Sequence, residues 1–336
     1  MSYLGNLKYG YMRKYIFRIY YKLGFSMRQY FRGYFMLNRL IKEKTSDEIY
    51  VLLTENIGDD VYGMAYVKSL KEKYSVKVSI FCREDRRRLI ESFVGSYDVI
   101  IGFNKKSKEW TQIRSISNSR GLINKARKHR IMSVFPFHYI PLNLNDGRTE
   151  LDYIRTDMLH LDDNASIQYP SLTDEPIHSI RGFEEIRDKV VVINPYSLSM
   201  NSDMLHFFNR ISLSLVSMGY KVFTNVVGNQ KALAGSEPLN CSIYEFYAIC
   251  NQIPLVISVR SGLIDMSISA KSNFFVYYFP FADNAFMYSK MSIFYKRHTL
   301  KAWKTDNVEE HLYRDDEEAY KALMKFMNKS ELKIES

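Results

Sequence analysis

Short apolar runs alternate with longer amphipathic segments along most of the chain, and this alternation limits the fold more than any other feature. A first series of runs covers residues 49–53, 77–81, 97–103 and 131–135, and a second covers residues 189–195, 220–226, 254–259 and 273–279. The segments between them carry apolar residues every three or four positions, as on one face of a helix. Strands that alternate with helices are typical of parallel sheets. The sequence therefore predicts an α/β fold with two parallel-sheet domains in tandem.

Chain length and the segment between the two series define the expected domains. A chain of 336 residues exceeds one ordinary domain of about 100–150 residues. The proline-containing stretch over residues 167–178 is the best candidate for a linker. We therefore expect a basic aromatic helical arm, an N-terminal domain, a C-terminal domain and a helical tail, which cover residues 1–48, 49–175, 176–300 and 301–336.

The cysteines and the apolar runs indicate the compartment. The chain has no CxxC motif and no Cys/His cluster, and its three cysteines lie apart in the sequence, at Cys82, Cys241 and Cys250. This pattern indicates neither a disulfide framework nor a zinc site, and it fits a reducing compartment. No uncharged apolar run reaches the roughly 18 residues of a spanning helix. We expect a cytoplasmic protein.

The N-terminal arm carries most of the net charge. Residues 1–42 contain nine Lys or Arg, no acidic residue and twelve Tyr or Phe, so +9 of the formal +10 lies there. Cations interleaved with aromatic rings can bind the interface of an anionic membrane. The alternatives are an arm that packs on its own protein and an arm that binds nucleic acid; no RNA-binding motif supports the latter. We expect a peripheral association with the inner face of the cell membrane and no nucleic-acid partner.

Charged residues crowd the junction between the first apolar run and the following helix. The loop reads Glu55-Asn56-Ile57-Gly58-Asp59-Asp60. Ligands of parallel sheets bind at the carboxyl ends of strands, and a carboxylate there can take a proton from a hydroxyl group. The alternative is a helix cap, for which Asp60 is the first choice if the helix begins near Val61.

The order of several motifs resembles that of bacterial heptosyltransferases (glycosyltransferase family 9-like) and of polysaccharide-biosynthesis glycosyltransferases. The motifs are a strand followed by NIGD and a helix, then VVVINPYSLSMN, GYKVFTNV, SIYEF and VISVRSGLIDMSIS, which together cover about residues 49–278. The resemblance implies a GT-B fold, in which two Rossmann-like domains face a cleft. It places the acceptor on the N-terminal domain and the nucleotide sugar on the C-terminal domain.

The resemblance also implies roles for the first loop. Asp59 matches the aspartate that acts as general base toward the acceptor hydroxyl. Glu55, Asn56 and Gly58 are expected on the acceptor side. His138 is a further acceptor-side candidate, and a histidine packed in a core or loop is its alternative.

On the donor side, the sequence favours a metal-independent site without a cofactor. The chain has no Asp-x-Asp motif, so helix N-termini and a cation would stabilise the leaving diphosphate. The alternatives are a structural salt bridge for Arg260, a helix-fixing role for Asp265 and a cap at Ser242 for Glu245. The expected donor-side residues are Asn194, Ser197, Ser199, Glu245, Arg260, Ser261, Gly262 and Asp265.

Two departures from the family leave the donor sugar open. PYSLSMN lacks the lysine that heptosyltransferases tend to have there, and Arg260-Ser261-Gly262 replaces Asp-Ser-Gly. The expected function is transfer of a sugar to a saccharide or lipid-linked acceptor in surface polysaccharide biosynthesis, as for lipopolysaccharide or capsule. One rival is a polysaccharide pyruvyltransferase, whose N-x-G-D turn also matches but whose S-R-x-H element is missing. The other is a non-catalytic nucleotide-binding scaffold at the membrane.

Overall fold

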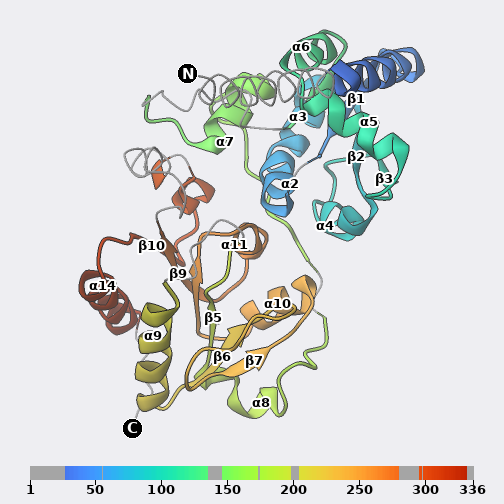
Figure 1. The fold of residues 1–336 in the computed structure, drawn as a ribbon. Helices are drawn as coiled ribbons and strands as arrows, with labels where there is room; N and C mark the ends of the chain where they lie inside the picture. Colours follow the sequence, from blue (N-terminus) through green and yellow to red (C-terminus); the bar gives the residue numbers. More distant parts are fainter. Residues whose placement is uncertain are drawn as a thin grey trace, which may run out of the picture.

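The computed structural model describes residues 27–54, 56–134, 146–172, 175–197, 204–279, 295–296 and 298–330. Three candidate site residues of the sequence analysis, Glu55, His138 and Ser199, lie outside the described residues, as does the arm before residue 27. Figure 1 shows two α/β domains, one above the other, with an extended segment leading to helix α8 in the lower one. The predicted α/β fold with two parallel-sheet domains is confirmed.

The N-terminal sheet contains four parallel strands in the order β3-β2-β1-β4. The central strand β1 is buried along four of its five residues, because helices cover both faces of a parallel sheet. The strands are β1 (Glu48–Leu52), β2 (Lys77–Arg83), β3 (Val99–Phe103) and β4 (Ile131–Ser133).

Successive residues of β1 point to opposite faces of this sheet, and each face has its own helices. Ile49 and Val51 pack under α2 (Ile57–Met64), α3 (Val67–Tyr74) and α4 (Arg87–Glu91). Tyr50 and Leu52 pack under the helix over residues 27–43, α5 (Lys108–Ser117) and α6 (Arg120–Lys128). Three short elements complete the domain: η1 (Glu84–Arg86), α7 (Glu150–Tyr153) and the π-helix η3 (Ile154–Met158).

The helix over residues 27–43 belongs to the N-terminal domain. Met36, Leu37 and Leu40 are buried in the cluster beneath Tyr50 and Leu52. This part of the expected arm therefore packs on its own protein, which was one of the alternatives of the sequence analysis. Among the helices of the described ranges, none combines the length and the apolar character that crossing a bilayer requires.

The C-terminal sheet contains six parallel strands in the order β10-β9-β8-β5-β6-β7. Helices α9 and α14 cover one face, where Phe207, Phe208 and Leu323 pack against the strands; Figure 1 shows these two helices beside each other. Helices α10 and α11 cover the other face. The strands are β5 (Val190–Asn194), β6 (Lys221–Asn225), β7 (Glu237–Leu239), β8 (Leu255–Val259), β9 (Asn273–Tyr278) and β10 (Val308–Leu312). The helices are α8 (Phe183–Ile186), η4 (Arg187–Lys189), α9 (Leu205–Ser217), α10 (Ile243–Cys250), α11 (Gly262–Ser267), η6 (Leu300–Trp303) and α14 (Asp316–Lys329).

The tail expected over residues 301–336 contains the predicted helix, α14, but it is not separate from the C-terminal domain, because residues 308–312 form strand β10 of the sheet. This strand reads VEEHL, and its charges hide it from a search for apolar runs. Glu310 is buried, and its carboxylate accepts hydrogen bonds from the Tyr278 hydroxyl and the Leu300 N–H. Strand β7 was also missed, because it is only three residues long and contains a proline.

Candidate active site

The two domains meet where helices α2 and α11 begin, at the carboxyl ends of β1 and β8. A Cβ atom on Gly58 would lie 3.0 Å from the Cα of Gly262 and 2.7 Å from Oδ2 of Asp265. A Cβ atom on Gly262 would lie 2.8 Å from the Gly58 nitrogen. The two backbones therefore touch, and neither position has room for a larger residue. Gly58 and Gly262, both predicted at the site, lie against each other.

Asp59 lies in the first turn of α2, and its carboxylate helps to start that helix. The cap residue is Asn56, whose backbone N–H donates to Oδ2 of Asp59 at 3.0 Å. The expectation of a helix from Val61 with Asp60 as its cap is wrong, because α2 begins at Ile57 and Asp60 is buried inside it. Asp59 itself is half-buried. Its role as a general base stays a prediction.

Arg260 is held inside the protein. Its Nη1 donates to Oδ2 of Asp265 at 2.8 Å, its Nη2 donates to the Tyr62 hydroxyl at 3.1 Å, and its Nε donates to the carbonyl of His298 at 3.2 Å. Nη2 also lies 2.7 Å from Oδ1 of Asp265. Every guanidinium nitrogen thus contacts a protein oxygen. The structure shows the salt bridge that the sequence left as the alternative, and the contact with a diphosphate stays a prediction.

The Arg260–Asp265 pair is almost closed to solvent, with side chains 12% and 4% exposed. Burial raises the pKa of Asp265, and the Arg260 guanidinium opposes that rise. Burial lowers the pKa of Arg260, but the Asp265 carboxylate outweighs it and the pKa lies above its usual range. Because Tyr62 belongs to the N-terminal domain, the pair also joins the two domains.

A second contact between the domains lies beside this pair. His298 Nδ1 and Glu150 Oε2 are 2.6 Å apart; the Glu150 side chain is buried, and the His298 side chain is 14% exposed. The ring of Trp303 meets that of Tyr62 edge-on at 5.1 Å. Sequence reasoning missed Glu150, His298 and Tyr62 as site neighbours. Glu150 and His298 lie outside the apolar runs and motifs, so no sequence signal could have found them.

Asn194 ends β5 and connects three strand ends of the C-terminal sheet. Its Nδ2 donates to Oγ of Ser258 at 3.0 Å and to Oγ of Ser261 at 3.4 Å. Its Oδ1 accepts from Nδ2 of Asn225 at 3.0 Å. Asn225 was missed, although its place at the end of the 220–226 run could have indicated it. Ser197 follows β5 closely and is half-exposed. The predicted Asn194, Ser197 and Ser261 thus lie along one sheet edge.

Glu245 holds the linker rather than closing a capping box. The Ser242 hydroxyl accepts the N–H of Glu245 at 3.0 Å, which confirms the predicted cap of α10. The Glu245 carboxylate turns to the linker, where Oε1 accepts the N–H groups of His178 and Ser179, each at 2.7 Å. Burial raises the pKa of Glu245, but these hydrogen bonds outweigh it and lower the pKa overall. Its ribose contact stays a prediction.

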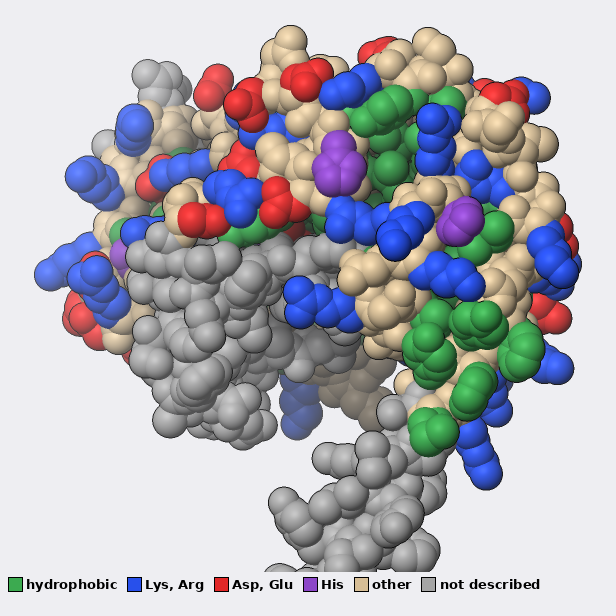
Figure 2. Space-filling model, turned by 90° about the horizontal axis from the view of Figure 1, so that it is seen from above, with side chains coloured by type: hydrophobic (Ala, Val, Ile, Leu, Met, Phe, Trp, Pro, Cys, Tyr) green, Lys and Arg blue, Asp and Glu red, His purple; other side chains and the backbone are tan. Residues whose placement is uncertain are grey.

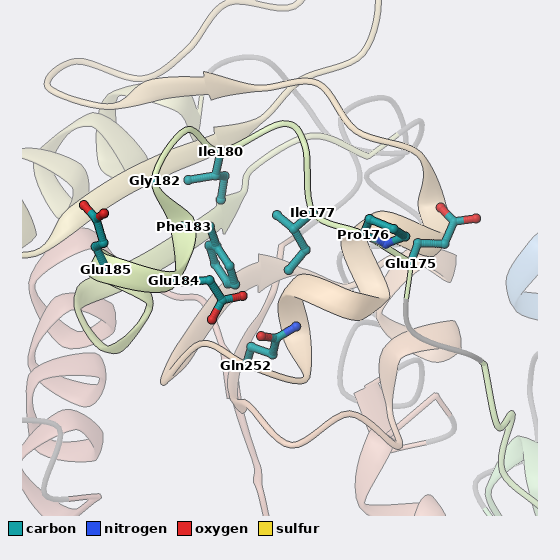
Figure 3. Close-up of a pocket in the computed structure, with 9 residues that line it drawn as sticks. All are labelled: Glu175, Pro176, Ile177, Ile180, Gly182, Phe183, Glu184, Glu185 and Gln252. Carbon is teal, nitrogen blue, oxygen red and sulfur yellow. The ribbon is translucent and has the colours of Figure 1, made fainter.

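A cavity of about 390 Å³ lies next to α8, and its lining includes none of the predicted site residues. Figure 3 shows its lining, in which Ile177 and Phe183 face acidic side chains such as Glu184. The lining also includes Gln252, which precedes β8, so the cavity lies near the amino ends of strands. Because ligands of parallel sheets bind at the carboxyl ends, this cavity is a poor candidate for the nucleotide. Within the described part of the chain, no three His, Cys, Asp or Glu side chains are grouped to hold a metal ion.

Comparison with known proteins gives similarity at the level of the fold. No family model and no curated protein matches the sequence. The structure of a glycosyl transferase family 9 protein from Veillonella parvula aligns with a TM-score of 0.55 at 15% identity, over 83% of this chain and 90% of that chain. E. coli heptosyltransferase WaaC, solved with ADP, aligns at 0.52 with 9% identity, over 84% and 99%. E. coli ADP-heptose LPS heptosyltransferase II aligns at 0.52 with 11% identity and the same coverage. This chain therefore has the GT-B fold of these glycosyltransferases.

Proposed function

We propose that this chain is a glycosyltransferase, which moves a sugar from a nucleotide sugar on its C-terminal domain to a saccharide or lipid-linked acceptor on its N-terminal domain. The observation that carries the proposal is the position of Asp59. In a GT-B fold, this carboxylate stands in the first turn of α2, next to Gly58, which touches Gly262 of the other domain. A base at that boundary can reach substrates from both sides.

The proposed reaction is a direct displacement. Asp59 takes the proton of an acceptor hydroxyl while the hydroxyl oxygen bonds to the anomeric carbon of the donor sugar. The bond from that carbon to the diphosphate oxygen breaks, and the nucleoside diphosphate leaves as an anion. Ser197 and Ser261 are the donor-side groups we expect to contact the diphosphate. Asn194 positions Ser261 through its amide.

We further propose that the reaction needs no metal ion. The sequence lacks the Asp-x-Asp motif that metal-dependent transferases often use. Turnover should be unchanged by a chelator. A strict requirement for magnesium or manganese would contradict this part of the proposal.

A thermal-shift panel with UDP-, GDP-, ADP- and CMP-sugars tests the function and identifies the nucleotide. A true donor binds only the native state and stabilises it by mass action, by about 2.7 kcal/mol at a hundredfold excess over its Kd. We expect one nucleotide class to raise the melting temperature. The absence of any shift with all four classes would contradict the proposal.

The outer side of the helix over residues 27–43 supports a peripheral place at an anionic membrane. Met27, Phe31 and Phe35 are 57%, 50% and 66% exposed, and their spacing of four puts them on one face. Arg28 and Arg32 are exposed next to them. Figure 2 shows a face on which hydrophobic side chains group together with Lys and Arg side chains beside them. Such a surface can insert rings between lipid headgroups while cations contact anionic lipid.

Liposome sedimentation tests the membrane proposal. Full-length protein should sediment with anionic liposomes and be partly released by high salt, because each engaged Lys or Arg contributes about 1 kcal/mol that salt screens. Phe31→Ser with Phe35→Ser should weaken binding about tenfold or more, since burial of one such ring is worth about 1.5–3 kcal/mol. Val94→Ser with Val227→Ser, at two other exposed apolar positions, is the control. Equal sedimentation of both double variants would contradict a role for this helix.

A further inference from the structure

Each of the two described sheets ends in two edge strands, and three of these strands carry a feature that discourages pairing with another chain. Strands β4 and β7 are only three residues long, and β7 contains Pro238. Strand β10 carries Glu309 and Glu310. Short strands, prolines and charged residues are the usual means by which proteins protect such edges.

The fourth edge strand, β3, has none of these features. It reads VIIGF over five residues, without a charge or a proline. Within the described part of the chain, β2 is the one strand that pairs with it, and Figure 1 shows it at the outer side of the N-terminal domain. Val99 is 49% exposed, and the other residues of the strand are half-buried. An unprotected apolar edge of this kind is a template for a further strand.

The hydrogen bonds between β2 and β3 show which backbone groups of β3 face outward. The N–H of Asp98 donates to the carbonyl of Val78 at 2.8 Å. Successive residues of a strand direct their backbone groups to opposite sides, so every second residue from Asp98 faces β2. The N–H and C=O groups of Val99, Ile101 and Phe103 therefore point away from the sheet.

The charges near β3 lie at its two ends and not on its outer edge. Asp98 directly precedes the strand, and Lys105 and Lys106 follow it closely. Arg87 donates to the carbonyl of Ile100 at 3.2 Å, and the backbone of that residue faces β2. An antiparallel pair of two β3 strands would thus bring the acidic end of each beside the cationic end of the other, whereas a parallel pair would bring like charges together.

We propose that β3 is the interface of a symmetric dimer, in which two copies of this chain pair their β3 strands antiparallel and join their N-terminal sheets into one. The two-fold axis passes beside Ile101, whose N–H and C=O groups bond to those of Ile101 in the second copy. Val99 then lies opposite Phe103 of the second copy, and its exposed side chain becomes buried. A second copy is the fitting occupant because the strand is complementary to itself in charge and in apolar character.

The dimer has a consequence for the proposed membrane binding, although it does not depend on it. A two-fold axis between antiparallel strands of one sheet is perpendicular to that sheet, so the same face of both copies lies on the same side. Met36 and Leu40 attach the helix over residues 27–43 to one face of the N-terminal sheet, and Phe31 and Phe35 are exposed on its outer side. Both copies would therefore present these rings in one direction and bind a membrane with the avidity of two linked sites.

Sedimentation velocity of the full-length protein without lipid tests the dimer. Because a pair of five-residue strands is a small interface, we expect a dissociation constant of about 1–100 µM. Val99→Lys should raise this constant about tenfold or more, because the new cation would lie diagonally across from Lys105 of the second copy. Val99→Thr keeps a β-branched residue without charge, and Val227→Lys adds the same charge at an exposed position of the C-terminal domain. Both controls should associate as wild type does.

A cross-link tests the register of the proposed pair. The Cα atoms of a hydrogen-bonded antiparallel pair are about 5.5 Å apart, which is within the range of a disulfide. Ile101→Cys should therefore form a covalent dimer on mild oxidation with copper phenanthroline. Ile100→Cys would lie opposite Gly102 of the second copy, so this variant and the wild-type protein should stay uncross-linked.

Three results would overturn the inference: a wild-type protein that stays monomeric over this concentration range, a dimer that Val99→Lys leaves intact, or a cross-link of Ile100→Cys as fast as that of Ile101→Cys. Circular dichroism and the melting temperature of Val99→Lys show that it is folded. Phe31→Ser with Phe35→Ser should dimerise as wild type does, and loss of its dimer would place the interface on the helix instead. The nucleotide sugar that stabilises wild-type protein should stabilise Val99→Lys equally, so the dimer and the proposed reaction can fail separately.

Discussion

The carboxyl edges of the two sheets carry similar polar side chains, but these side chains differ in their hydrogen-bond partners. On the C-terminal edge, Asn194 bonds to Asn225 and Ser258, and Arg260 pairs with Asp265. These groups fill the edge and connect it to the N-terminal domain through Tyr62. Protein partners, rather than a ligand, take up most of their hydrogen-bonding capacity.

The N-terminal edge instead keeps an open cavity. Lys105 and Arg114 line it from α5 and its loop, and Thr54 and Asn56 line it from the end of β1. The difference teaches that a polar residue at the end of a strand can serve the scaffold or a ligand, and that only its partners distinguish the two. The predictions below test whether Arg260 and Asp265 on the first edge serve the scaffold and whether Asp59 on the second edge serves catalysis.

The largest expected effect concerns Asp59, at the carboxyl edge of the N-terminal sheet. Asp59→Asn should lower turnover about 10²- to 10⁴-fold, the range for loss of a general base. Asparagine keeps an oxygen that can accept the Asn56 N–H, so the start of α2 and the binding of nucleotide sugar should be preserved. Steady-state kinetics measures turnover, and thermal shift measures the binding of nucleotide sugar. The control is Glu91→Gln, which removes the charge of an exposed carboxylate on α4. Near-normal turnover of Asp59→Asn would contradict the role of Asp59 as general base.

On the C-terminal edge, Arg260→Met should lower the free energy of unfolding by about 3–5 kcal/mol, because it leaves Asp265 buried without its partner. The double variant Arg260→Met/Asp265→Leu should recover most of that loss, since it removes both charges. Urea unfolding without nucleotide measures each. Unchanged stability of Arg260→Met with weaker nucleotide binding would contradict the scaffold interpretation and return Arg260 to the diphosphate.

Where the two edges touch, Gly262→Ala should destabilise the protein by about 1–3 kcal/mol, as is usual for overpacking. The added Cβ would lie 2.8 Å from the Gly58 nitrogen, and backbone cannot move aside as a flexible side chain can. Gly121→Ala is the matched control, because its Cβ would meet nothing closer than Tyr30 at 4.0 Å. In a helix that change should be neutral or stabilising. Equal stability of the two variants would show that the domains do not meet at Gly58.

The smallest effect concerns Glu245, whose carboxylate binds the linker. Glu245→Gln should cost about 1 kcal/mol at neutral pH through weaker hydrogen bonds to His178 and Ser179. Because folding lowers the pKa of Glu245, its contribution is complete above the pKa of the unfolded chain and is lost as pH falls through the pKa of the folded one. Urea unfolding should therefore show the two proteins converging in acid. Exposed Glu237→Gln should show no such trend.

Much of the fold could be predicted because burial on both faces makes the strands of parallel sheets apolar runs. Eight runs were found in this way, from residues 49–53 to residues 273–279, and each overlaps a strand. The search for apolar runs fails for a strand that carries charged residues. Strand β10 carries Glu310, whose charge is tolerated because Tyr278 and Leu300 donate to it from other elements.

For the candidate site, the sequence by itself determined which loops lie at strand ends and which residue types they carry, including Gly58, Asp59 and Gly262. Periodicity and turn chemistry are local, so they can be read along the chain. Only the tertiary structure decided which groups meet: Arg260 with Asp265 and Tyr62, Glu150 with His298, and Lys105 with Thr54 at one cavity. Except for Arg260 and Asp265, which are neighbours along the chain, these partners are far apart in sequence. Hydrogen bonds and ion pairs depend on distances of a few ångströms, which only the packing of two domains sets.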